Sequence, residues 1–406
     1  MTPMSASTPQ SLGTSPTVST RITAVQDPVI PIVGELTKAH PGTISLGQGV
    51  VSYSPPPEAQ NKLAAFFAEP DNHKYKLVQG IPELLEAIRS KLVRDNQFEL
   101  SDSERIVVTA GSNMGFNNAL LAIADPGDEI IIPVPYYFNH EMAIRMANCH
   151  PVAVPTDQNF QLDLDAIKDA VTNRTRAIVT ISPNNPSGAV YPKETLLAIN
   201  RFCQENGLYH ISDEAYEYFT YGDARHFSPG SIPGSDAHTI SLYSLSKAYG
   251  FASWRIGYMV VPQHLLAPIK KIQDTILICP PVISQYAAWG AISAGSTFWQ
   301  PHVANLASTR RAVIEALSNL EDSGTFNHAD GAFYFLVKLA TAADPMDVIR
   351  HLVTEHRVAA IPGTAFGLRD GCHLRIAYAA LPEEPLLEGI ERFTTGVKSY
   401  LQTYKA

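Results

Sequence analysis

The sequence predicts an α/β fold with two domains. From about residue 105 to residue 262, short runs rich in valine and isoleucine alternate with amphipathic helical patterns, as in RIVVTA (105–110) followed by NMGFNNALLAIAD (113–125). This alternation is typical of a mostly parallel sheet that helices cover on both faces. The length of 406 residues exceeds the size that one hydrophobic core usually fills, so a second domain is expected.

The remaining elements of the first domain follow the same pattern. Further strands are expected at 129–135, 177–183, 208–214, 238–246 and 256–262, with helices between them at 140–147 and 193–207. Two more helices are expected before the first strand, at 29–40 and 82–95. The segment ISLGQGVVSYSPPPE (44–58) is rich in glycine and proline, which predicts an ordered loop.

From about residue 296 the pattern changes to long helices around short strands, which predicts a smaller α+β domain. The helices are expected at 305–319, 345–355 and 384–402, and the strands at 333–339 and 373–379. The first twenty residues carry no charge and are rich in Ser, Thr and Pro, which favours disorder. The expected organisation is a tail at 1–20, an N-terminal segment at 21–59 that joins the small domain, a large domain at 60–295 and a small domain at 296–406.

The composition argues against several classes of protein. The net charge is -9 without acidic or basic blocks, which disfavours nucleic acid and anionic membranes as partners. No apolar run reaches the ~18 residues of a membrane span, and no secretory signal begins the chain. The four cysteines form no CxxC pair and no HExxH motif occurs, so we expect reduced thiols in the cytoplasm and no metal site; the cysteines are Cys149, Cys203, Cys279 and Cys372.

Polar loops follow five of the predicted strands. In chain order they are AGSN (110–113), PYYFNH (135–140), NNPSG (184–188), DEAY (213–216) and SLSK (244–247). Ligands of open parallel sheets bind at the carboxyl ends of the strands. The five loops are therefore expected to converge on one rim of the sheet.

Lys247 is the candidate nucleophile on this rim. A lysine amine is protonated at neutral pH, so its reactivity requires desolvation or conversion to an imine. Ser244, Ser246 and Arg255 lie close in sequence and offer hydroxyl groups and a guanidinium fork, which suit a phosphate. An exposed lysine beside an ion-paired arginine would explain this segment about equally well.

The other loops each have a chemical and a plain structural interpretation. Asp213 could pair with the nitrogen of a pyridine ring in a bound cofactor, and Tyr216 could bind a hydroxyl group on that ring. Alternatively, the two residues could be a helix cap and a core tyrosine. Asn185 could contact a ring oxygen, although its surroundings indicate first of all a turn. Gly111 precedes a predicted helix whose N–H groups could bind a phosphate, or the loop is simply a turn.

Together and in this order, the segments resemble the class I/II aminotransferase family of fold-type I pyridoxal-phosphate (PLP) enzymes, from about residue 28 to residue 400. The family pattern is a phosphate loop, an aromatic lid, N-P-x-G, D-x-A-Y, and S-x-S-K with an arginine eight residues on. The matching positions are Gly111, Ser112, Asn113, Tyr137, Asn185, Asp213, Tyr216, Ser244, Ser246, Lys247 and Arg255. The resemblance implies a large domain with a mostly parallel seven-stranded sheet.

The resemblance also implies a role for each position. Lys247 would hold PLP as a Schiff base and then act as the general base. Asp213 would pair with the ring nitrogen, Asn185 and Tyr216 would bind the ring hydroxyl, and Tyr137 would stack on the ring. The remaining matched residues would bind the cofactor at its phosphate; they are Gly111, Ser112, Asn113, Ser244, Ser246 and Arg255.

Four further positions complete the expected site. His140 either supports Asp213 from behind or only begins a helix. Tyr75 matches a tyrosine that reaches the phosphate of the neighbouring subunit, which implies a homodimer with shared sites. Arg375 matches the arginine that binds the substrate α-carboxylate through two contacts. Gly49 lies in the loop on the substrate side, where Asn185 is a second expected substrate contact.

The activity implied is a ping-pong transamination between an L-amino acid and a 2-oxo acid. Asn113 stands where some relatives that act on aspartate have a lysine, and the GQG loop (47–49) resembles that of relatives with neutral or aromatic donors. The sequence VVSY (50–53) then departs from the family's FPDF. Two alternatives remain: a C–S or other β-lyase on the same scaffold, and a non-catalytic PLP-binding module, which a basic DNA-binding segment would normally accompany.

Overall fold

The computed structural model describes residues 18–404. Of the tail predicted at 1–20, residues 1–17 lie outside this range. The short helix α1 (Thr20–Thr23) comes first and is followed by α2 (Val29–Ala39), which matches the helix predicted at 29–40. Within the described range, no helix has both the length and the apolar character needed to cross a membrane.

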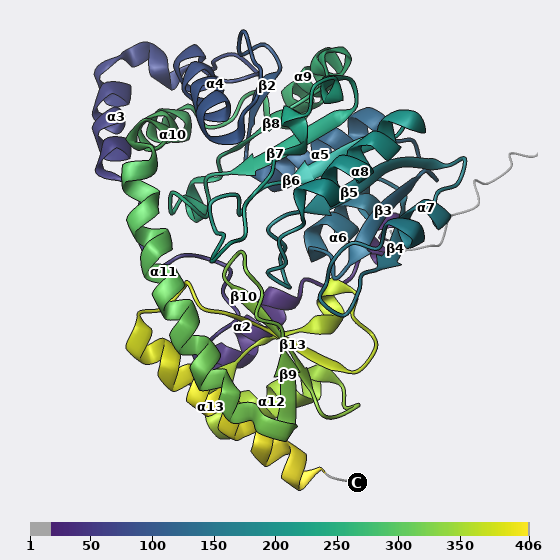
Figure 1. The fold of residues 1–406 in the computed structure, drawn as a ribbon. Coiled ribbons are helices and arrows are strands. Elements are labelled where there is room, and N and C mark those ends of the chain that lie inside the picture. Colours follow the sequence, from purple (N-terminus) through teal and green to yellow (C-terminus); the bar gives the residue numbers. More distant parts are fainter. Residues whose placement is uncertain (1–17, 405–406) are drawn as a thin grey trace, which may run out of the picture.

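A seven-stranded sheet forms the centre of the larger part of the molecule (Figure 1). Its strand order is β2-β8-β7-β6-β5-β3-β4. The strands are β2 (Ile106–Thr109), β3 (Glu129–Val134), β4 (His150–Pro155), β5 (Thr175–Ile181), β6 (Tyr209–Asp213), β7 (Thr239–Ser244) and β8 (Gly257–Val260). Strand β8 pairs antiparallel with β2 and β7, whereas the other pairs are parallel. The predicted mostly parallel seven-stranded sheet is confirmed.

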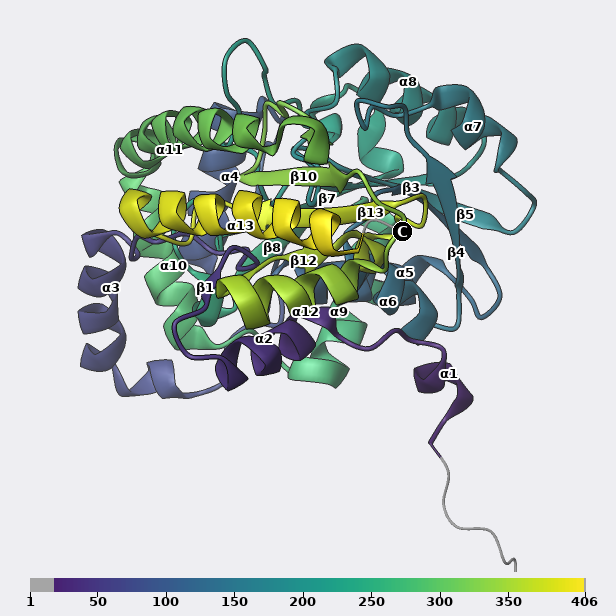
Figure 2. The same ribbon diagram turned by 90° about the horizontal axis from the view of Figure 1, so that it is seen from below.

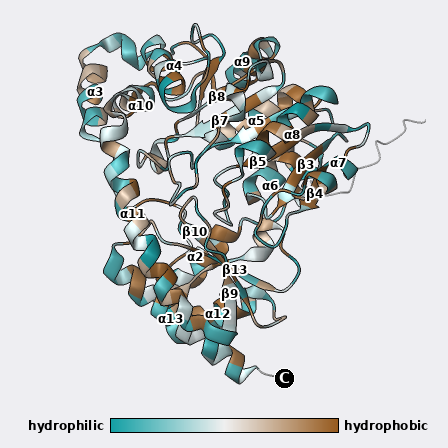
Figure 3. Cartoon of the chain, viewed as in Figure 1, coloured by the Kyte–Doolittle hydropathy of each residue, from teal (hydrophilic) through white to brown (hydrophobic). Residues whose placement is uncertain are grey.

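Helices cover both faces of this sheet because its strands are apolar on both sides. In β3, Ile130 and Ile132 pack with α5, α6 and α9, while Ile131 between them packs with α7 and α8 on the opposite face. Figure 3 shows the hydrophobic colour along β3, β5 and the neighbouring helix α5. The helices of this part are α3 (Pro57–Ala68), α4 (Pro82–Asn96), α5 (Ser112–Ile123), α6 (Phe138–Met146), α7 (Leu164–Asp169), α8 (Lys193–Glu205), α9 (Gln263–Leu277) and α10 (Val282–Ala294).

A smaller antiparallel sheet has the strand order β12-β13-β10-β9. Its strands are β9 (Gly324–Phe326), β10 (Tyr334–Leu339), β12 (Ile361–Pro362) and β13 (Cys372–Ala377). The accompanying helices are α11 (Ser296–Leu317), α12 (Pro345–His356) and α13 (Glu383–Thr403). Figure 2 shows α12 and α13 side by side across this sheet. Short 3-10 helices connect the elements; they are Pro70–His73, Pro229–Ser231, Ser235–Ala237, Ala252–Trp254, Ser318–Ser323 and Gly363–Phe366.

We propose the two-domain division predicted above, with boundaries near 59/60 and 295/296. Strand β1 (Ile44–Ser45) pairs in parallel with β11 (Val358–Ala359), which supports an N-terminal segment attached to the small domain. Gly295 adopts a φ of 61° between α10 and α11, which supports the second boundary. Helix α3 begins at Pro57 and packs on α10, so the large domain would start slightly earlier than 60.

Candidate active site

The five loops at the carboxyl ends of the strands meet in one cavity of about 230 Å³, which residues from the small sheet close from the other side. Most of the residues predicted for the site line this cavity; they are Gly49, Ser112, Asn113, Tyr137, Asn185, Asp213, Tyr216, Ser244, Ser246, Lys247, Arg255 and Arg375. Gly111 and His140 lie immediately behind the lining. Tyr75 lies elsewhere and is 77% exposed. The structure therefore brings together all but one of the predicted residues.

The amine of Lys247 projects into this cavity from the loop after β7. Its Nζ donates a hydrogen bond to the Gly49 carbonyl at 2.6 Å. Burial, and then the positive charges of Arg375 and Arg255, lower the pKa of the amine from 10.5 to about 8, although Asp213 opposes the shift. A usable fraction of the amine is therefore neutral and nucleophilic near physiological pH.

Asp213 ends β6, lines the cavity and is buried. Its Oδ2 lies 3.0 Å from Nε2 of His140, and its Oδ1 accepts a hydrogen bond from the Ala215 N–H at 3.1 Å. The His140 ring stacks on Phe116, with ring centroids 3.9 Å apart. The backbone and an immobilised imidazole therefore fix the orientation of the carboxylate.

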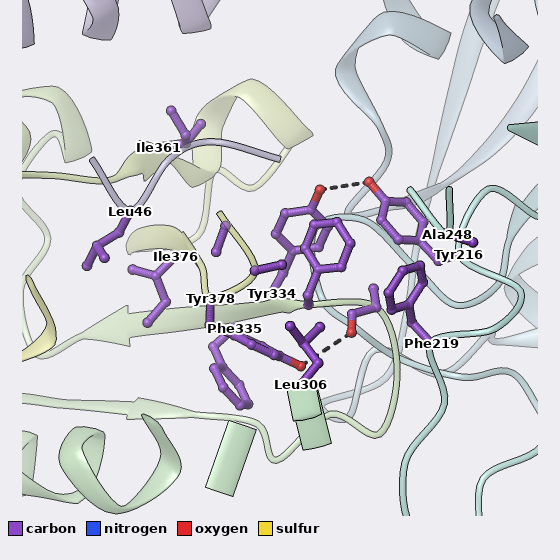
Figure 4. Close-up of a cluster of buried hydrophobic side chains, with 14 of the residues drawn as sticks. Leu46, Tyr216, Phe219, Ala248, Leu306, Tyr334, Phe335, Ile361, Ile376 and Tyr378 are labelled. Carbon is purple, nitrogen blue, oxygen red and sulfur yellow. Dashed lines mark hydrogen bonds between the residues drawn. The ribbon is translucent and has the colours of Figure 1, made fainter. Parts of the chain in front are cut away.

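Three hydroxyl and amide groups meet beside Lys247. The hydroxyls of Tyr216 and Tyr334 lie 2.7 Å apart (Figure 4), and Nδ2 of Asn185 donates to the Tyr216 hydroxyl at 3.4 Å. Tyr334 lines the cavity but is absent from the predicted site. The sequence offers one signal for a role of Tyr334 in the site. Tyr334 ends the segment GAFY (331–334), which precedes Arg375 as it does in the family that the sequence resembles.

Arg375 enters the cavity from β13 of the small sheet and is 2% exposed. It donates to Oδ1 of Asn185 and to the Gly47 carbonyl, both at 2.8 Å. Its guanidinium lies 4.5 Å from the ring centre of Tyr334, and its Nε is buried without a hydrogen-bond partner in the described structure. The arginine is thus held rigidly and retains a free donor.

The part of the cavity at Ser112 and Arg255 has the features of an anion cradle. Helix α5 begins at Ser112, so the N–H groups of its first turn have no partner within the helix. Gly111 precedes the helix with a φ of 81°. A Cβ atom on Gly111 would collide with the Arg255 guanidinium. A helix N-terminus, serine hydroxyls and an arginine together suit a phosphate group.

Tyr137 stands at the entrance to α6 as its N-terminal flanking residue. Its hydroxyl accepts a hydrogen bond from Nδ2 of Asn139 at 2.8 Å, and its ring lies edge-on to His140. The ring therefore lines the cavity in a fixed position beside His140, the partner of Asp213.

A family model of class I and II aminotransferases matches residues 41–393 of the chain. The chain therefore belongs to this family. A probable aspartate/prephenate aminotransferase from Aquifex aeolicus is 39% identical over 79% of this chain and 82% of its own length. An aromatic aminotransferase from Arabidopsis thaliana is 32% identical over 96% of this chain and 98% of its own. The structure of a double mutant of the aspartate aminotransferase from Thermus thermophilus has a TM-score of 0.87 and 31% identity, and covers 94% of this chain and 100% of its own.

This aminotransferase is PLP-dependent, as its family is, and the chemistry of the cavity fits that cofactor. A lysine amine with a lowered pKa shares the cavity with a buried carboxylate and with the features of an anion cradle. The absence of a Cβ on Gly111 lets the Arg255 guanidinium approach the start of α5. The names of the relatives give no support to the β-lyase alternative. When bound, PLP supplies an electron sink and carries the amino group between the two substrates.

Proposed function

We propose that the predicted residues hold PLP in this cavity in the roles that the family resemblance implies. The observation that carries the proposal is that the Lys247 amine, the buried Asp213 carboxylate and the cradle at Gly111 share one cavity. Asp213 would pair with the ring nitrogen, and Asn185 and Tyr216 with the ring hydroxyl. Tyr137 would cover one face of the ring.

The phosphate would lie at the amino-terminal end of α5. The N–H groups of Ser112 and Asn113, the hydroxyls of Ser244 and Ser246, and the Arg255 guanidinium would bind it. In substrate turnover, Arg375 would bind the α-carboxylate, and Lys247 would move the proton from the substrate Cα. These contacts would orient the Cα–H bond toward the amine, which reduces the entropic part of the barrier.

The decisive experiment tests the Lys247 link. Borohydride reduction of the holoenzyme followed by peptide mass spectrometry should place the added cofactor mass on Lys247. The Lys247→Ala variant should lose this adduct and its turnover. An adduct on another lysine, or turnover retained by the variant, would contradict the assignment.

We infer that the amino donor has a neutral or aromatic side chain. Of the residues that line the cavity in the described structure, those with a positive charge are Lys247, Arg255 and Arg375, each already assigned to the cofactor or the α-carboxylate. Asn113 is uncharged, and Ile30 and Phe138 add apolar surface. A distal carboxylate would therefore lack a cation from this chain.

A donor panel tests this inference. Single half-reactions followed by cofactor absorbance should be faster with phenylalanine, methionine and glutamine than with aspartate. The Asn113→Lys variant should shift the ranking toward aspartate, since it adds a cation at the cavity wall. A wild-type preference for aspartate would contradict the donor class without affecting the Lys247 assignment.

We also propose a homodimer in which each subunit completes the other's site. Tyr75 is 77% exposed, and Phe67 and Leu77 near it are 62% and 61% exposed. Such neighbouring apolar side chains favour burial against a partner. In that arrangement Tyr75 would reach the phosphate of the second subunit.

Mixed dimers of two defective variants test the shared site. The Lys247→Ala and Tyr75→Ala variants would each be impaired alone. Refolding them together should restore activity, because one site per mixed dimer would then contain both Lys247 and Tyr75. Absence of recovery in a preparation shown to contain mixed dimers would contradict sharing, and a monomer in sedimentation would contradict the dimer itself.

We place the enzyme in the cytoplasm. The four cysteines are free and buried, which suits a reducing compartment. Cell fractionation with a tagged copy of the full chain would test this placement.

A further inference from the structure

Tyr334 stands between the two halves of the site. It lies on β10 of the small sheet and is 1% exposed. Its hydroxyl lies 2.7 Å from that of Tyr216, in the loop after β6 of the large sheet, and its ring packs against the Arg375 guanidinium at 4.5 Å. Figure 4 shows the two hydroxyls directed at each other. Tyr334 thus contacts one residue proposed for the cofactor and one proposed for the substrate.

The direction of the hydrogen bond between the two tyrosines follows from their surroundings. Among the described residues, the Tyr334 hydroxyl has the Tyr216 hydroxyl as its hydrogen-bond partner, whereas the Tyr216 oxygen also accepts from Nδ2 of Asn185. A buried hydroxyl proton without an acceptor is costly. Tyr334 therefore donates to Tyr216, and the Tyr216 proton is left for the ring hydroxyl of the cofactor that the proposed function assigns to it.

The donation fixes the proton of Tyr216. A tyrosine hydroxyl has one proton to donate and can accept hydrogen bonds through its oxygen. Here the Tyr216 oxygen accepts from Nδ2 of Asn185 at 3.4 Å and, in the direction argued above, from Tyr334. With both neighbours acting as donors, the remaining direction for the Tyr216 proton is toward the cavity.

We propose that Tyr334 is a positioning residue that donates to Tyr216 and thereby keeps the Tyr216 proton directed at the ring hydroxyl of the cofactor. The inference rests on the cofactor contact proposed for Tyr216. Because Tyr334 belongs to the small sheet and Tyr216 to the loop after β6 of the large sheet, hydrogen bonding at the cofactor depends on how the small sheet sits against the large one. Tyr334 acts through Tyr216, in contrast to the residues assigned to the cofactor directly.

The test is a pH titration of the absorbance of the lysine-bound cofactor in the holoenzyme. A hydrogen bond donated to the ring oxygen stabilises the deprotonated form of the lysine-bound cofactor. Weakening that bond therefore raises the pH at the midpoint of the titration. The Tyr334→Phe variant should raise the midpoint by roughly 0.5 to 1 pH unit, the size expected for one hydrogen bond. The Tyr216→Phe variant should raise it further, and adding Tyr334→Phe to that background should produce no extra shift.

The Tyr378→Phe variant is a matched control. Tyr378 is equally buried in the same core, but its hydroxyl bonds to the Ala332 carbonyl, outside the cavity. Its removal should leave the midpoint unchanged, and circular dichroism would show that all variants are folded. Each variant keeps its aromatic ring, so packing around Arg375 is retained.

The outcomes separate the two proposals. If Tyr216→Phe raises the midpoint but Tyr334→Phe leaves it unchanged or lowers it, the hydrogen bond runs the other way and the role of Tyr334 is refuted. If Tyr216→Phe itself produces no change, the cofactor contact of Tyr216 is wrong, and the inference about Tyr334 fails with it. An equal shift from Tyr334→Phe in both backgrounds would mean that Tyr334 acts independently of Tyr216.

Discussion

His140 lies directly behind Asp213, with Nε2 of the histidine 3.0 Å from Oδ2 of the aspartate. Both side chains are buried, and Phe116 stacks on the imidazole at 3.9 Å. The carboxylate therefore cannot rotate without losing a partner and leaving a buried charge poorly satisfied. Of the two interpretations of His140 that the sequence leaves open, this contact supports the one in which it orients Asp213.

The His140→Ala variant should weaken both cofactor binding and turnover. A hydrogen bond to a buried charged group contributes about 1.5–3 kcal/mol, so kcat/KM should fall roughly 10- to 100-fold. Steady-state kinetics and cofactor titration would measure the loss. His238→Asn is a suitable control, because His238 is buried beside Asn200 outside the cavity. Equal effects of the two substitutions would indicate a general loss of packing.

The Gly111→Ala variant should lose affinity for PLP by roughly tenfold or more, because the new Cβ would displace the Arg255 guanidinium from the cradle. Gly207→Ala is the matched control. Gly207 has a φ of 65°, similar to the 81° of Gly111, but a Cβ there would meet nothing within 4 Å. Equilibrium binding should show the loss for PLP in Gly111→Ala alone, and a much smaller loss for pyridoxal, which lacks the phosphate. An equal loss for both ligands would place the phosphate elsewhere.

The residues at strand ends were predictable because their signals are local. Asp213 ends the apolar run that forms β6, Lys247 follows the run that forms β7, and the rule for parallel sheets places both strand ends on one rim. The contact between Tyr334 and Tyr216 was not predictable in this way. It depends on how the small sheet sits against the large one, and on a β10–β13 register that pairs Leu336 with Arg375. Neither is encoded in a short stretch of sequence.

Missed elements have equally specific causes. Strand β4 carries prolines at 151 and 155, which weaken a strand pattern; it lies at the edge of the sheet, where prolines are tolerated. Helix α9 contains Pro268, and α10 is buried on several sides, so its apolar residues show little helical periodicity. Helix α3 begins at Pro57, within a segment predicted to be a loop, because proline also suits the first turn of a helix.

The Arg375→Lys variant should bind amino acid substrates more weakly. Lysine cannot reproduce the planar fork that now bonds Asn185 and Gly47 and offers a free Nε. We expect KM to rise roughly 10- to 100-fold. Phenylalanine and phenylethylamine, which lacks the carboxylate, would be compared as donors in half-reactions. The Arg310→Lys variant is a control, since Arg310 bonds the Ala329 carbonyl away from the cavity. An equal loss of rate with both donors would contradict the proposal that Arg375 binds the substrate carboxylate.

Capture of PLP by the apoprotein should depend on pH through the Lys247 amine. Its pKa is lowered to about 8 by burial, Arg375 and Arg255, so at pH 7 roughly a tenth of it is neutral. The neutral form increases with pH, so the capture rate should rise between pH 7 and 8 and level off above about 9. With N-acetyl-lysine methylamide the rise should continue beyond pH 10. In the Arg375→Leu variant the midpoint of this pH profile should move to higher pH, because a positive charge near the amine is removed. Stopped-flow absorbance measures the capture rate of the wild type and of the variant. A wild-type midpoint above about pH 10 would show that the amine is not desolvated.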